Sequence, residues 1–345
     1  MKRLTSFDIA KAIALCAVVF GHCSFGGAPR PLVDCAYSFS MPTFFFISGY
    51  FCREEKLDAT YVRKNFRSLI IPYVLTSIIL ITLCGLRAAI LPGEGHVFTT
   101  MRSWVVAVLY GSGGVFPGMP EGVIAVGAIW YLLALFWAKL LLASIREMKY
   151  PGLLSLILFI VGVQTKEAVW LPLSVQPALC AVLFMYVGQE ARRFSLFDKG
   201  RVPFLLWVCI VMTWLYCAAF YGQLYMVSNT YQHGAIDVIG GICGAMLMIK
   251  VGEGMAKARY LKYVESILAW IGRNTLPLFC MHLVVLNVVP WDYVFVWCGE
   301  NGIAVWKVML IIHTFFSALL TGLLYIMPKP VARAFFPKAK ATASR

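Results

Sequence analysis

The sequence RLTSFDIAKAIALCAVVFGH occupies residues 3–22 and guides the interpretation of the whole chain. From Ile9 onward it is largely apolar, and about 20 such residues in a helix cross the hydrocarbon core of a bilayer. Three ionisable residues lie in it, Asp8, Lys11 and His22. Ionisable groups are costly at membrane depth and are therefore candidates for function. Because of these residues and the apolar runs that follow, we interpret the stretch as an uncleaved first membrane span rather than a signal peptide.

The rest of the chain has the same apolar character. Of its 345 residues, 61% are hydrophobic and only 13% are charged, whereas a soluble domain has about 25% charged residues. We therefore predict an all-α polytopic membrane protein with about ten transmembrane helices. The predicted spans are 9–27, 37–52, 68–91, 123–145, 151–169, 173–190, 202–221, 234–251, 266–288 and 302–327. The apolar stretch 97–110 is too short to span and is interpreted as re-entrant or interfacial.

The basic residues indicate how these spans are oriented. The net charge is +14, from 30 Lys and Arg against 16 Asp and Glu. With a cytoplasmic N-terminus, most basic residues fall in cytoplasmic segments, namely 2–3, 53–67, 146–149, 192–201, 250–262 and 329–345. This bias is typical of inner membrane proteins and predicts that both termini are cytoplasmic, with no need for a nucleic-acid partner. We predict an integral membrane domain at 1–328 and a basic cytoplasmic tail at 329–345, in the cytoplasmic membrane.

The spacing of the ionisable residues in the first span places them on one stripe. Lys11 and His22 are eleven residues apart, which is about three helical turns and about 16 Å along one face. Asp8 precedes Lys11 by three residues and lies within pairing reach. The structural alternative is that Lys11 extends to the headgroups and that His22 bonds a neighbouring helix.

The same stretch, with its basic residue, ten residues and histidine, resembles the opening of the membrane acyltransferase-3 family. The branch it most resembles is similar to fucose 4-O-acetylase, although many members have Arg where this chain has Lys11. Four further motifs resemble the family in the same order: FSMPTFFFISGY (39–50), RKNFRSLIIPY (63–73), WYLLALF (130–136) and GRNTLPLFCMH (272–282). The resemblance covers nearly the whole chain.

The resemblance implies transfer of an acyl group, usually acetyl from acetyl-CoA, to a hydroxyl of a surface carbohydrate or its lipid-linked precursor. His22 would be the catalytic base, because a hydroxyl is a poor nucleophile until a base removes its proton. Lys11 would assist catalysis and bind CoA phosphates at the cytoplasmic side. Other residues in position to bind CoA phosphates are Arg63, Lys64 and Arg67, although ordinary positive-inside charge explains each of these three equally well.

Other polar residues receive weaker assignments. His282 is predicted to reach a depth similar to that of His22, and with Asp8 it is assigned to the acceptor side. Arg273 and Asn274 lie near the inner end of the same span, where a CoA role is possible. His313 stands alone in an apolar span and is interpreted as structural, and His96 and His233 are predicted to be solvated in outer loops. The outer Gly/Pro-rich loop 111–122 would cover the acceptor.

A transporter or flippase for a lipid-linked or acylated molecule is the alternative function. Transporters usually have polar groups on several helices around a midplane site, often in paired repeats, and this chain shows neither pattern. No metal site is indicated, since the 11 cysteines include no CxxC pair. The acceptor stays open between a polysaccharide sugar, a lipid-linked unit, a peptidoglycan sugar and a small metabolite, and the acyl group between acetyl and longer groups.

Overall fold

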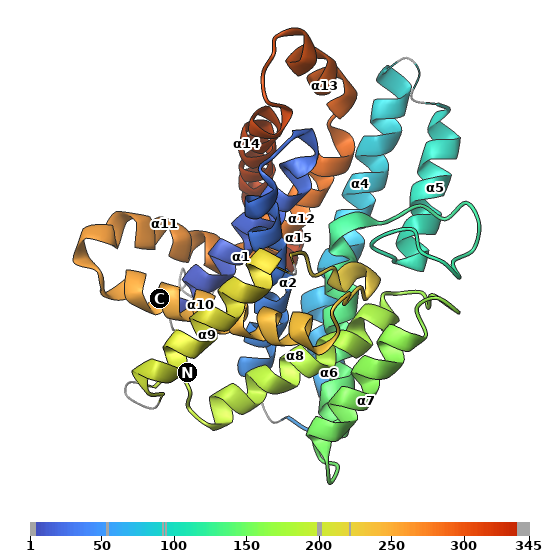
Figure 1. Ribbon diagram of the computed structural model, residues 1–345. Helices are drawn as coiled ribbons and strands as arrows, with labels where there is room; N and C mark the ends of the chain where they lie inside the picture. Colours follow the sequence, from blue (N-terminus) through green and yellow to red (C-terminus); the bar gives the residue numbers. More distant parts are fainter. Residues whose placement is uncertain are drawn as a thin grey trace.

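The structure is a computed structural model that describes residues 5–52, 55–91, 93, 95–198, 202–220 and 222–336 (Figure 1). Some of the basic residues predicted to be cytoplasmic lie outside the described residues, namely those at 2–3, 53, 199–201 and 337–345. The described residues form an all-α fold that contains no β-strand. Its helices are α1 (Thr5–Cys23), α2 (Arg30–Tyr50), α3 (Ala59–Asn65), α4 (Ile71–Ile90), α5 (Val97–Tyr110), α6 (Trp130–Ile145), α7 (Pro151–Gln164), α8 (Val175–Arg193), α9 (Phe204–Phe220), α10 (Ala235–Lys257), α11 (Lys262–Arg273), α12 (Thr275–Val288), α13 (Trp291–Glu300), α14 (Val305–Ile326) and α15 (Lys329–Phe335).

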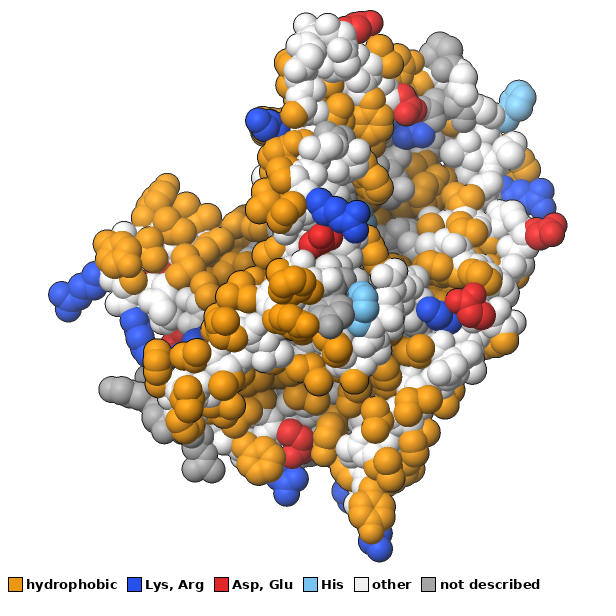
Figure 2. Space-filling view, viewed as in Figure 1, with side chains coloured by type: hydrophobic (Ala, Val, Ile, Leu, Met, Phe, Trp, Pro, Cys, Tyr) orange, Lys and Arg blue, Asp and Glu red, His pale blue; other side chains and the backbone are white. Residues whose placement is uncertain are grey.

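Several of these helices are long and apolar enough to cross a bilayer. Within the described residues, five meet both conditions, or six if the bent pair α11–α12 counts as one span. Three shorter apolar helices, α5, α7 and α9, accompany them. Large apolar side chains face outward, as at Leu205 and Ile311, which are 72% and 69% exposed, and hydrophobic side chains cover much of the face in Figure 2. The chain is a polytopic membrane protein, and each of the ten predicted ranges overlaps at least one helix.

The predicted span 266–288 is wrong in one respect, because it is not one continuous helix. Its two parts, α11 and α12, are bent by 76° around Asn274. Pro277 gives a physical reason: it has no N–H to donate to the carbonyl of Arg273, and its ring would clash there. The side chain of Asn274 instead donates to the carbonyl of Trp270 at 2.8 Å, at the end of α11.

One other boundary differs from the sequence prediction. The second span is not short, because α2 begins at Arg30 rather than at 37 and contains Pro42 within its 21 residues. The segment 97–110 forms the regular helix α5, which packs against α4. The predicted tail begins with α15, whose Phe335 is buried against the core.

The first helix lies near the middle of the bundle (Figure 1) and packs against α2, α10 and α11, with α12 and α14 farther along. Two glycines allow the close approach at its beginning. A Cβ at Gly272 would lie 1.7 Å from the carbonyl oxygen of Asp8, and one at Gly252 would lie 2.3 Å from that of Ser6. Such small residues let membrane helices pack backbone to backbone. They hold the start of α1 between α10 and α11.

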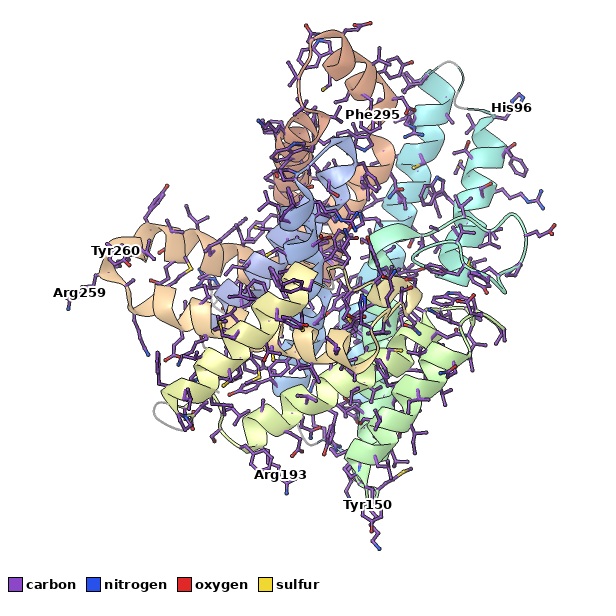
Figure 3. The ribbon with its side chains drawn as sticks, viewed as in Figure 1. His96, Tyr150, Arg193, Arg259, Tyr260 and Phe295 are labelled. Carbon is purple, nitrogen blue, oxygen red and sulfur yellow. The ribbon has the colours of Figure 1, made fainter. Side chains whose placement is uncertain are left out.

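The predicted loops lie at opposite ends of the molecule. In Figure 3, His96 and Phe295 lie at one end, whereas Tyr150 and Arg193 lie at the other. The first pair belongs to segments predicted to be outside and the second pair to segments predicted to be cytoplasmic. Arg259 and Tyr260 lie at the tip of the α10–α11 hairpin, which projects to one side.

Candidate active site along the first helix

Asp8 and Lys11 form an ion pair at the start of α1. The Nζ atom of Lys11 lies 2.8 Å from Oδ1 of Asp8, and Asp8 is only 5% exposed. The pairing predicted from their spacing is therefore confirmed. Lys11 also lines a cavity of about 180 Å³, here called the Lys11 cavity. Its other lining residues are Phe44, Ile47 and Ser48 of α2, Leu69 before α4, Tyr131, Leu132 and Leu135 of α6, and Thr275, Leu276 and Phe279 of α12.

We expect Lys11→Met to lower the free energy of unfolding by about 1–3 kcal/mol, because the substitution removes a charge partner from the buried carboxylate of Asp8. This range lies below that of a fully buried pair because the side chain of Lys11 is 25% exposed. Lys11→Arg keeps the charge and should cost less. Thermal unfolding of the purified variants in detergent measures the difference. Equal midpoints for Lys11→Met and Lys11→Arg would contradict the prediction.

His22, near the other end of α1, lines a second cavity of about 200 Å³, here called the His22 cavity. Its walls include Tyr37 and Met41 of α2 and Trp130 of α6. Loop residues complete it, namely Gly113, Gly127, Ala128 and Leu224 to Val227. Neither nitrogen of His22 forms a hydrogen bond to the residues that the structure describes. A side chain with this setting can accept a proton from a molecule that enters the cavity.

Phe279 of α12 lines both cavities. Its ring centroid lies 5.6 Å from that of Tyr131, which also lines the Lys11 cavity. The same ring centroid lies 6.3 Å from that of His282. The aromatic ring of Phe279 is therefore a shared wall between the cavity of Lys11 and the cavity of His22.

Two further histidines lie beside His22. The ring centroids of His22 and His282 are 5.1 Å apart, and the rings of His282 and His313 stack at 4.5 Å. Nδ1 of His282 lies 2.7 Å from Nε2 of His313, and Sγ of Cys23 lies 3.6 Å from Nδ1 of His313. His282 and His313 are fully buried. Within the described residues, no group of three or more His, Cys, Asp and Glu side chains is placed to hold a metal ion.

The structure brings some of the predicted site residues together and separates others. His22 and His282, which were predicted to reach a similar depth, lie next to each other, although α12 begins only at Thr275. Asp8 pairs with Lys11 instead of joining His282. His313 does not stand alone, because it contacts His282. Its position inside an apolar span was the only signal in the sequence, and the sequence does not show which helices are neighbours.

The predicted phosphate-binding residues lie near the Lys11 cavity in the chain but do not line it. Arg63, Lys64 and Arg67 are exposed on α3 and on the π-helical turn that leads into α4. Lys64 forms an ion pair with Glu55 at 2.7 Å. Arg273 is exposed and Asn274 half-buried, next to the lining residues Thr275 and Leu276. Of the remaining histidines, His96 is exposed, and His233 is exposed but contacts Asp237 at 3.3 Å.

A third cavity, of about 400 Å³, lies between α6, α7 and α8. Its rim carries both signs of charge, with Lys56, Arg146 and Arg193 beside Glu147 and Glu190. It contains none of the residues predicted from the sequence for the site. The acidic side chains oppose the binding of phosphates there.

The described residues thus form a helical membrane bundle in which a basic residue, Lys11, and a histidine, His22, line two adjoining cavities. Comparison with known families identifies its class. The profile of the acyltransferase 3 family, described as an acyltransferase domain, matches residues 4–326. The chain therefore belongs to this family of membrane acyltransferases. No curated protein matches it.

Proposed function

We propose that this protein transfers an acyl group, acetyl in the first instance, from cytoplasmic acyl-CoA to a hydroxyl of a cell-surface carbohydrate or its lipid-linked precursor. The observation that carries the proposal is the shared wall at Phe279. It separates a cavity lined by Lys11 from a cavity lined by His22, and helical spacing places these two residues on one face of α1. The two residues are about 16 Å apart along the helix. A donor bound at one cavity can therefore present its thioester to the other.

In this reaction His22 acts as the general base. It takes the proton of the acceptor hydroxyl while the hydroxyl oxygen attacks the thioester carbonyl carbon. The tetrahedral intermediate then collapses, the C–S bond breaks, and the CoA sulfur recovers the proton from His22. The products are the acyl ester and free CoA, and no further reactant is needed. Because neither nitrogen of His22 is hydrogen-bonded to the described residues, the ring can accept the proton of an incoming hydroxyl, which supports this role.

The reaction proposed here takes place across the bilayer. The phosphates of CoA bind the basic residues at the cytoplasmic side, Lys11 first and Arg63, Lys64, Arg67, Arg273 and Asn274 around it. The pantetheine arm occupies the Lys11 cavity, whose walls are mostly apolar. The acceptor enters the His22 cavity from the outer side, beneath Gly113 of the 111–122 loop. Only the acyl group passes Phe279, so the protein need not alternate between inward- and outward-facing states.

We expect the triple variant Arg63→Gln, Lys64→Gln, Arg67→Gln to bind CoA about tenfold or more weakly, because it removes three charges that attract phosphate. The loss should shrink at high salt, which screens exposed charges. The control is Lys257→Gln, Arg259→Gln, Lys262→Gln at the α10–α11 tip, which removes the same charge at another exposed site. Calorimetric titration with CoA at low and high salt tests both. Equal affinities at low salt would reduce Arg63, Lys64 and Arg67 to markers of topology.

Mass spectrometry of surface glycans tests the function as a whole. Cells with the protein should carry glycans heavier by one acyl group than cells without it, and the His22→Ala variant should not restore the difference. Purified protein should also release free CoA from acetyl-CoA when the glycan fraction is added. A transporter would instead change the location of a glycan without changing its mass. Glycans of equal mass and no CoA release would contradict the proposal.

A further inference from the structure

We infer that the Nε2–H group of His282 donates a hydrogen bond to the carbonyl oxygen of the thioester and stabilises the oxyanion that forms there. This inference rests on the acyl transfer proposed above and adds a second catalytic residue to it. It is drawn from the hydrogen bonds around His282 and His313. They determine which nitrogen of each neutral ring carries the hydrogen.

The backbone carbonyl of His282 determines where the hydrogen of His313 lies. Nε2 of His313 is 3.0 Å from this oxygen, and a carbonyl oxygen can only accept a hydrogen bond. Nε2 of His313 must therefore carry the hydrogen. In the neutral ring Nδ1 then has none, and it faces the thiol of Cys23 at 3.6 Å, which can donate to it.

The same N–H group determines the hydrogen of His282. Nδ1 of His282 lies 2.7 Å from Nε2 of His313, and two N–H groups cannot face each other at this distance. Nδ1 of His282 therefore accepts, and its hydrogen lies on Nε2. This Nε2 is buried and has no hydrogen-bond partner among the residues that the structure describes. Buried donors without a partner are rare and call for an explanation.

The position of His282 explains why its buried N–H donor has no partner. Its ring centroid lies 5.1 Å from that of His22, the proposed base. Acyl transfer needs a base near the attacking hydroxyl and a donor near the carbonyl oxygen that becomes negative. The ring of Phe279 lies beside His282 as well as between the two cavities. His282 itself lines neither cavity, so an acyl group that displaces the Phe279 ring would arrive beside the ring of His282.

His313 and Cys23 act through His282 and are positioning residues. Trp291 of α13 stacks against His313, with the two ring centroids 5.9 Å apart. This packing holds the His313 ring in the orientation that directs its N–H to His282. Without His313, the hydrogen of His282 would no longer be confined to Nε2.

The test combines kinetics with direct observation of the tautomer. We expect His282→Phe, which keeps a planar ring without a donor, to lower kcat about 100- to 1,000-fold with little change in KM for acetyl-CoA. His282→Gln retains an N–H donor and should recover at least about tenfold of this loss. If the kcat of His282→Phe lies within about threefold of the wild-type kcat, the inference is overturned.

Nitrogen-15 NMR of the full-length protein in detergent, at slightly alkaline pH, is independent of activity. The chain has five histidines, so single substitutions can assign their signals. We expect the Nε2–H tautomer at His282, and a mixture of tautomers when His313 is replaced by Phe. A His282 hydrogen on Nδ1 would overturn the inference even if His282→Phe fails to fold. If wild-type protein transfers no acyl group, the proposed function fails, whereas an active His282→Phe variant rejects only this role of His282.

Discussion

His22→Ala should abolish acyl transfer, with a fall in kcat of at least about 100- to 10,000-fold, because the acceptor hydroxyl loses the base that takes its proton. The protein should still insert and fold, since the His22 ring forms no hydrogen bond to the described residues. Turnover of acetyl-CoA with the glycan acceptor measures the first effect, and thermal unfolding in detergent measures the second.

The matched control for this substitution is His96→Ala. His96 is exposed at the end of the molecule that Figure 3 marks with its label, away from both cavities. The His96→Ala variant should therefore keep wild-type turnover. Near-normal turnover in purified His22→Ala protein would exclude His22 as the base, and the histidine would then be only a polar wall of its cavity.

Phe279→Ala should uncouple the two half-reactions. Removing the ring joins the Lys11 cavity to the His22 cavity, so water from the acceptor side gains access to the thioester. We expect hydrolysis of acetyl-CoA without acceptor to rise about tenfold or more, since a closed site normally excludes this side reaction. Phe279→Trp should have the opposite effect and slow transfer, because the larger ring blocks the passage. Release of CoA with and without the glycan acceptor measures both.

Phe44→Ala is the control for Phe279→Ala. Phe44 lines the Lys11 cavity but not the His22 cavity, so its removal enlarges one cavity without joining the two. It should not raise hydrolysis in the absence of acceptor. If Phe44→Ala and Phe279→Ala hydrolyse acetyl-CoA at the same rate, Phe279 does not separate donor from acceptor.

The sequence predicts the parts of the site that depend on spacing along one helix. The pairing of Asp8 with Lys11 follows from helix geometry and is present in the structure. The similar depth of His22 and His282 follows from their positions along the two spans, and the structure places their rings 5.1 Å apart. The all-α membrane fold follows from composition, since few charged residues leave most of the surface to lipid.

The sequence does not predict the features that depend on which helices are neighbours. His313 joins His282 because α14 packs on α12, and no spacing within either helix indicates this contact. Phe279 resembles any other apolar residue until the cavities on its two sides are known. Pro277 is a sequence signal for the helix break at Asn274. The apolar run continues through this position, so a search for spans by hydrophobicity alone does not detect the break.

A structure of the protein with a bound, non-hydrolysable acyl-CoA analogue would test the donor route that links Lys11 to His22. The phosphates should bind among Lys11, Arg63, Lys64 and Arg67, with the pantetheine arm in the Lys11 cavity. The ring of Phe279 should be displaced, and the acyl carbonyl should lie between His22 and His282. Binding of CoA at the end marked by His96 and Phe295, or in the cavity of Arg146 and Arg193, would contradict this account.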